Sequence, residues 1–111
     1  MKLLIMLLLL VLVLSAQSPP THIATLQWTD AINPPGTLYN VYRATGLCSG
    51  TPAFTRIASM IGGLNYQDKT ITTGTYCYAV TAASNNGESP QSNTAQAVLV
   101  SAPTGLTVVV Q

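Results

Sequence analysis

Residues Gly74 to Ala83 show the clearest hydrophobic pattern in the chain, a regular alternation of two kinds of side chain. A period of two residues, rich in Tyr, Val and Thr, is typical of a β-strand with one face against a core. We therefore predict a central strand here, on which the other strands pack. The side chains predicted to face the core are Tyr76, Tyr78, Val80 and Ala82.

The same alternation recurs in shorter segments, which are separated by turn-forming residues such as those of Asn33–Gly36. In the first of these segments, Trp28 falls on the face predicted to point inward, and it is the largest core residue that we predict. Tyr39 and Val41 are expected to point inward, whereas Arg43 is expected to reach outward at a strand end. No period of 3.6 residues follows residue 18, so an all-β domain without helices is predicted. The predicted strands span Ile23–Thr29, Leu38–Ala44, Ala53–Ser59, Leu64–Ile71, Thr75–Ala83 and Thr94–Val100, and Arg56 blunts Ala53–Ser59 as an edge strand.

Residues 1–18 have the layout of a secretory signal peptide. Lys2 gives a positive start, Leu3–Leu14 is an unbroken apolar run, and small or polar residues follow it. A membrane anchor is the alternative, but a helix that spans a bilayer needs about 20 apolar residues. We expect cleavage after Ala16 or Ser18, and a mature protein that is secreted or periplasmic and free of the membrane.

The chain beyond residue 18 carries few charges, and they balance. Three basic residues stand against three acidic ones: Arg43, Arg56 and Lys69 against Asp30, Asp68 and Glu88. This leaves no net field to attract nucleic acid or anionic lipid, so neither is expected as a partner.

The two cysteines, Cys48 and Cys77, are predicted to form a disulfide, because they belong to a chain with a secretion signal. Cys77 lies on the parity opposite to Tyr76 and Tyr78. The bridge is therefore expected on the outer face of the sheet, where it would tie a loop to the central strand. Closing a loop of roughly 30 residues contributes about 3–4 kcal/mol in the chain-entropy model.

Residues 21–101 resemble a fibronectin type III domain. The matching pieces are "LQWT" around Trp28, "YNVYR" at Tyr39–Arg43, "YQD" at Tyr66–Asp68, and "GTYCYAVTA" followed by "NNGES". The resemblance implies an immunoglobulin-like β-sandwich of two sheets. It also implies that Tyr76 is a tyrosine-corner residue, whose hydroxyl bonds to the backbone a few residues upstream, and that the loops Asp30–Gly36 and Ser84–Asn93 share one pole.

One segment departs from the family pattern. The family's first strand has only the short, polar "QSPPTH" as its counterpart, yet a similar strand follows the last one, as "SAPTGLTVVVQ" at Ser101–Gln111. We divide the chain into a leader (1–18), a domain (19–101) and this tail (102–111). The tail is either a strand donated to another molecule, a disordered end, or the start of a further domain at Pro103.

The sequence offers little for catalysis. His22 is the single histidine, and the three carboxylates are scattered over turns without catalytic or metal-ligand spacing. We expect Asp68 to cap a turn, and we expect no enzyme activity, metal or cofactor.

Two functions remain. The first is a secreted, non-catalytic binding or spacer module that presents polar loops to a protein or polysaccharide. The alternative is a structural subunit that associates with itself head to tail by donating its C-terminal strand. The candidate partner-binding residues are Asp30, Asn33, Asn85, Asn86, Glu88 and Gln91, and the candidate strand donors are Leu106, Val108 and Val110.

Overall fold

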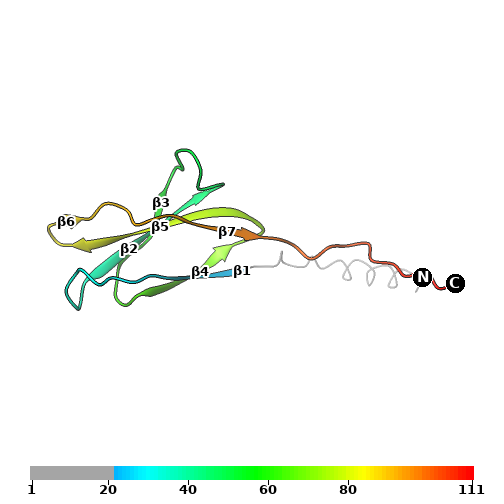
Figure 1. Cartoon of the computed structure of the whole chain (residues 1–111), viewed down its shortest axis with the longest axis horizontal. Helices are drawn as coiled ribbons and strands as arrows, with labels where there is room; N and C mark the ends of the chain where they lie inside the picture. Colours follow the sequence, from blue (N-terminus) through cyan, green and yellow to red (C-terminus); the bar gives the residue numbers. More distant parts are fainter. Residues whose placement is uncertain (1–21) are drawn as a thin grey trace, which may run out of the picture.

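The computed structural model describes residues 22–111 as seven β-strands in two sheets (Figure 1). This described part contains no helix, so it holds none that could cross a membrane, and the all-β prediction is confirmed. The predicted leader, its cleavage and the join after it lie outside the described residues. The strands are β1 (His22–Gln27), β2 (Leu38–Thr45), β3 (Thr55–Ile61), β4 (Asn65–Ile71), β5 (Gly74–Ser84), β6 (Gly87–Glu88) and β7 (Ala95–Leu99).

The small sheet pairs β1 with β4, and the large sheet has the order β3-β2-β5-β6, with β7 also paired to β5. All pairings are antiparallel. Strand β5 is central, as predicted, because it pairs with β2 along one side and with β6 and β7 along the other. Strand β3 lies at an edge with Arg56 exposed, also as predicted.

The core lies between the two sheets, in the arrangement of a β-sandwich. Tyr39, Val41 and Val80 of the large sheet form its buried centre. Trp28 packs against this centre with its ring edge-on to Tyr39, at 5.4 Å between centroids. It follows β1 and is only half-buried, so the predicted largest core residue lies at the rim of the core.

The outer face of the large sheet carries a second buried layer, which the alternation did not predict. Cys77, Ala79 and Thr81 are buried there, although they point away from the core between the sheets. The predicted disulfide is present and joins Cys77 to Cys48 in the connection between β2 and β3. The Cys48 N–H also donates to the Gln96 Oε1 at 2.9 Å, so this connection is folded back over the sheet.

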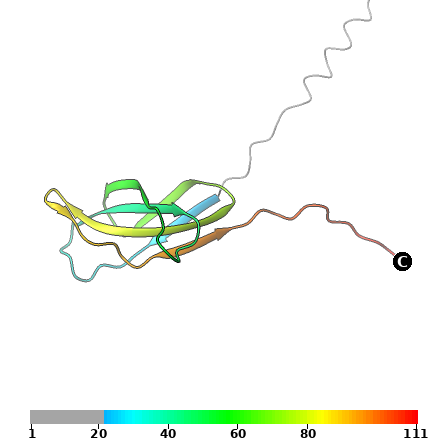
Figure 2. The ribbon, with the colours of Figure 1, turned by 90° about the horizontal axis from the view of Figure 1, so that it is seen from above.

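Residues 100–111 leave the end of β7 as a tail without secondary structure. Figures 1 and 2 show it running away from the domain along the long axis. The predicted donor side chains are almost fully exposed on it, at 92% for Leu106, 80% for Val108 and 87% for Val110. The Ser101 hydroxyl lies 2.7 Å from that of Thr73, and every residue of the tail is exposed.

Candidate functional site

Two loops meet at the end of the domain opposite the tail, as the resemblance implies (Figure 1). We call residues 30–36 and 84–93 together the loop pole. An open groove of about 620 Å³ lies between them. Pro34 and Pro35 line it on one side, Asn85 and Asn86 on the other, and Met60 at the end of β3 also borders it.

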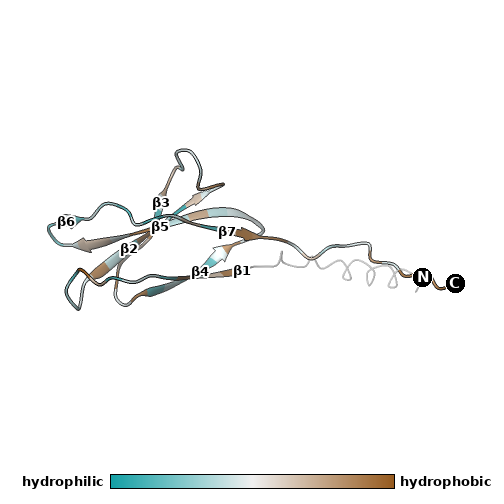
Figure 3. Cartoon of the chain, in the orientation of Figure 1, coloured by the Kyte–Doolittle hydropathy of each residue, from teal (hydrophilic) through white to brown (hydrophobic). Residues whose placement is uncertain are grey.

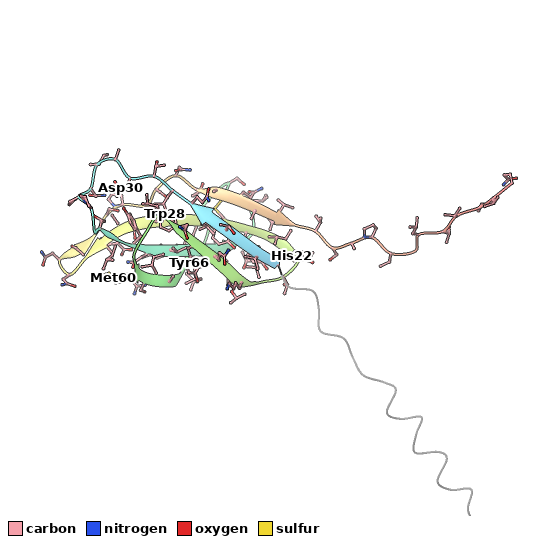
Figure 4. All side chains as sticks on the ribbon, turned by 90° about the horizontal axis from the view of Figure 1, so that it is seen from below. His22, Trp28, Asp30, Met60 and Tyr66 are labelled. Carbon is pink, nitrogen blue, oxygen red and sulfur yellow. A yellow bond between two sulfur atoms is a disulfide. The ribbon has the colours of Figure 1, made fainter. Side chains whose placement is uncertain are left out.

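Asp30 closes the first loop from within (Figure 4). Its carboxylate accepts the N–H groups of Ile32 and Asn33 at 3.1 and 3.0 Å, the Asn33 Nδ2 at 2.8 Å and the Tyr39 hydroxyl at 2.7 Å. The backbone N–H of Asn33, then its side chain and the Tyr39 hydroxyl, hold the pKa of Asp30 well below its ordinary value. Asp30 and Asn33, two of the candidate binding residues, therefore bond to each other within the loop.

Glu88 fastens the second loop to the outer face of the large sheet. Its Oε2 accepts the Asn40 Nδ2 at 3.0 Å, the Thr81 Oγ1 at 2.5 Å and the Tyr42 hydroxyl. These three hydrogen bonds, that of Asn40 foremost, lower the pKa of Glu88 to about 2. The Glu88 carboxylate is thus engaged by its own domain.

Asn40 extends this network to the end of β3. It is buried, and its Oδ1 accepts the N–H of Met60 at 2.8 Å. Met60 has a φ of 53°, in the left-handed region that residues other than glycine and asparagine rarely adopt. The hydrogen bond from Met60 to Asn40 helps to hold this conformation beside the groove.

Two serines attach the rest of the second loop to β5. The Ser89 Oγ accepts the N–H of Ala82 at 2.9 Å, and the Ser92 Oγ accepts the N–H of Val80 at 3.0 Å. Each serine N–H donates back to the carbonyl oxygen of the same residue, at 2.8 Å in both cases. The loop beyond β6 therefore follows the edge of β5 closely.

The remaining candidate residues face solvent. Asn85, Asn86 and Gln91 are exposed, and within residues 22–111 their side-chain amides make no hydrogen bond. The connection from β6 to β7, which contains Gln91, is mainly hydrophilic (Figure 3). These three side chains are exposed amides of the loop pole that are not engaged within the described residues.

The sequence prediction missed an ion pair between the two sheets. The Arg43 Nη1 lies 2.7 Å from the Asp68 Oδ2, and the Asp68 side chain is 1% exposed. Arg43 was predicted to reach outward, but it shares the parity of Tyr39 and Val41 and points between the sheets. Asp68 was predicted to cap a turn, but it lies inside β4 and is buried.

Asp68 has four hydrogen bonds in all. Besides Arg43, they come from the Tyr78 hydroxyl at 2.8 Å and from the Thr70 N–H and hydroxyl at 3.1 and 2.8 Å. Burial alone would raise the pKa of Asp68, but these bonds, that of Arg43 first, lower it. Burial, and then the bond to Asp68, raises the pKa of Tyr78. The cluster therefore stays charged at Asp68 and neutral at Tyr78, and it links β4 to β2 and β5.

Tyr76 lies beside this cluster. The Arg43 guanidinium sits 5.6 Å from the centre of its ring, and the Tyr76 hydroxyl accepts the N–H of Thr72 at 3.4 Å. The second contact is the upstream backbone bond that the resemblance implies for Tyr76. His22, at the start of β1, is half-buried, and no cluster of three or more metal-ligating side chains occurs in residues 22–111.

A second cavity runs along the free side of β1, and we call it the edge groove. It has a volume of about 500 Å³. Leu26 and Trp28 line it from the small sheet, Val80 forms part of its floor, and Ala95 and Gln96 border it from β7. Polar side chains, Gln27 and Asn93 among them, line the rest of the edge groove.

No protein-family model matches the chain, and no curated protein matches it either. The structure shows an all-β domain of two sheets, consistent with a β-sandwich.

Replacing Asp68 with Ala is predicted to lower the free energy of unfolding by about 3 kcal/mol, because it leaves Arg43 and Tyr78 without their acceptor inside the sandwich. Urea denaturation at neutral pH measures the change. The matched control is Lys69→Ala, an exposed neighbour on the same strand, which should change stability by less than about 0.5 kcal/mol. Equal stabilities of the two variants would contradict the role given to the ion pair.

Stability is also predicted to fall in acid because of Glu88. Its pKa drops from 4.5 to about 2 on folding, so its contribution is complete above pH 4.5 and is lost as the pH falls towards 2. Glu88→Gln removes this titration and should flatten the dependence of the denaturation midpoint on pH within that window. An unchanged pH dependence in the variant would show that the carboxylate is not engaged.

Proposed function

We propose that the chain is a secreted, non-catalytic binding or spacer module of the fibronectin type III type, which contacts a protein or polysaccharide partner through the loop pole. The observation that carries this proposal is that some polar side chains of the loop pole are hydrogen-bonded within the domain and others are not. Asp30 and Glu88 are engaged inside the domain, whereas Asn85, Asn86 and Gln91 are free to contact a partner.

The internal hydrogen bonds support binding because they order the loops in advance. A loop that is already fixed loses less conformational entropy when a partner binds. Asp30 fixes the first loop, and Glu88, Ser89 and Ser92 fix the second. A rigid scaffold with exposed loop side chains is the usual arrangement for recognition by a β-sandwich.

The loop pole also indicates the chemistry of the partner. Its two loops contain no Lys or Arg, and both of their carboxylates already accept several hydrogen bonds. The other exposed groups are neutral amides, serines, three prolines and Ile32, which is 93% exposed. Because both carboxylates stay ionised, the loop pole carries a net negative charge, and it suits a partner that bonds to the neutral amides without bringing further negative charge.

The fibronectin type III assignment has separate support. The order of the strands, the bond from the Thr72 N–H to the Tyr76 hydroxyl and the placement of both loops at one pole all agree with the resemblance. The Cys48–Cys77 disulfide is compatible with export to an oxidising compartment. Because one fold serves many functions, the loop pole and not the fold carries the proposal.

The test screens the purified chain against arrays of neutral glycans and of secreted proteins, at low and high salt. A variant with Asn85, Asn86 and Gln91 all changed to Ala should lose binding to the partners that the unaltered chain captures. Its matched control changes three exposed neutral residues elsewhere, Ser49, Gln67 and Thr72, to Ala and should bind normally. Captured partners that bind the loop variant with unchanged affinity would refute the proposal.

A further inference from the structure

Strand β1 has one free edge. Strand β1 pairs with β4 only, and within residues 22–111 no other strand pairs with it. Natural edge strands are usually blunted by charged residues or proline, as β3 is by Arg56. The β1 segment "HIATLQ" contains no Lys, Arg, Asp, Glu or Pro. Its free edge is therefore suited to pairing with another strand.

The register shows which backbone groups face this free edge. The Trp28 N–H donates to the Leu64 carbonyl at 3.1 Å, so Trp28 belongs to a hydrogen-bonded pair with the β4 side. Such pairs recur at every second residue of an antiparallel ladder, which assigns Leu26 to the same side. The N–H and C=O groups of Thr25 and Gln27 consequently point towards the edge groove.

The edge groove offers apolar surface as well as backbone partners. Leu26 and Trp28 belong to the inward face of the small sheet, and they line the groove together with Val80 from the core. Figure 4 shows this side of the domain, with β7 on one flank of β1 and β4 on the other. A strand placed here would bury apolar side chains against Trp28 and pair its backbone with β1 at the same time.

The tail has the pattern that such a strand needs. Leu106, Val108 and Val110 share one parity, and all three are exposed. The terminal part of the tail is hydrophobic in Figure 3, although the structure places it against nothing. The run 106–110 is one residue shorter than β1, so most of β1 could pair with it.

We propose that residues 106–110 of one molecule insert into the edge groove of a second copy, pairing antiparallel with its β1 and seating Leu106 and Val108 against Trp28. The direction of the chain favours a second copy over the same molecule. Strand β1 runs towards the loop pole, whereas β7 and the tail run away from it (Figures 1 and 4).

A second copy in the same orientation, displaced along the long axis, would receive the tail at its loop pole. The tail would then run along that copy's β1 in the antiparallel sense without turning. To reach its own groove, the tail would have to reverse direction just after β7 and would then lie parallel to β1, which is the slightly weaker pairing. Since the donor and acceptor surfaces differ, the contact is head-to-tail and gives open chains. The edge groove shares Ser92 and Asn93 with the loop pole but none of the three proposed binding amides, so this inference does not depend on the proposed function.

The test is sedimentation velocity of the purified chain over a wide range of concentration. The unaltered chain should form a ladder of species that grows with concentration. Changing Leu106 and Val108 to Asp should leave only monomer, because the inserted face would carry two charges. The matched control, Thr107→Asp with Val109→Asp, puts the same charges on the outward parity and should assemble like the unaltered chain.

A second variant tests the acceptor. Thr25→Pro removes an N–H that faces the edge groove and is not used in pairing with β4, so its melting temperature should stay close to that of the unaltered chain while its assembly is lost. If this variant unfolds, a peptide of residues 102–111 takes its place as the test. Added to the unaltered chain, the peptide should occupy the edge groove and reduce the size of the oligomers, and its Leu106→Asp form should not.

A chain that stays monomeric at all concentrations, or a series of oligomers that persists after Leu106 and Val108 are changed to Asp, would overturn the proposal. A monomer that is destabilised by those two changes would instead place the tail in its own groove.

Discussion

The small sheet depends on the large one, because two strands do not make an independently stable sheet in water. Leu26, Trp28 and Tyr66 attach it through the core, and the Arg43–Asp68 pair attaches it through charge. A buried carboxylate is tolerated only when its acceptor capacity is filled, and Asp68 fills it with four hydrogen bonds. The pair therefore restricts how β4 can sit on β2 and β5, and β4 in turn holds β1.

The small number of charged residues also affects the surface. Three acidic residues occur in the chain, and each is used inside the domain: Asp68 between the sheets, Asp30 within a loop and Glu88 over the outer face. The loop pole is consequently ordered, its ionised groups are the hydrogen-bonded carboxylates of Asp30 and Glu88, and the edge of β1 has no charge to discourage another strand. Of the basic residues, Arg43 lies between the sheets, whereas Arg56 and Lys69 are exposed.

The sequence predicted the strands well, because alternation reports directly on which side chains face a core. Parity alone also indicated that Arg43 shares the inward face of Tyr39 and Val41, but a charged residue at a strand end was expected to find water. Its partner Asp68 belongs to another strand, and no local pattern reveals which strands face each other. The burial of Cys77, Ala79 and Thr81 was missed for a related reason, since their cover comes from a distant connection and from Glu88.

Alternation does not show whether a predicted strand or core residue has neighbours on both sides, and this limited the predictions for the tail and for Trp28. The alternation of Leu106, Val108 and Val110 indicates a strand, and the structure shows these residues exposed on an extended tail. Trp28 was predicted to be the largest core residue, yet it lies at the rim of the core because β1 has a neighbour on one side only.

We infer above all that strand β1 is paired with β4 along one edge and is unpaired along the other. Amide hydrogen exchange in dilute solution, measured residue by residue by NMR, tests it most directly. The account predicts slow exchange at the N–H groups of Leu26 and Trp28, which face β4, and fast exchange at those of Thr25 and Gln27, which face the edge groove. Equal protection of all four amides in the monomer would contradict it, because β1 would then be paired on both sides.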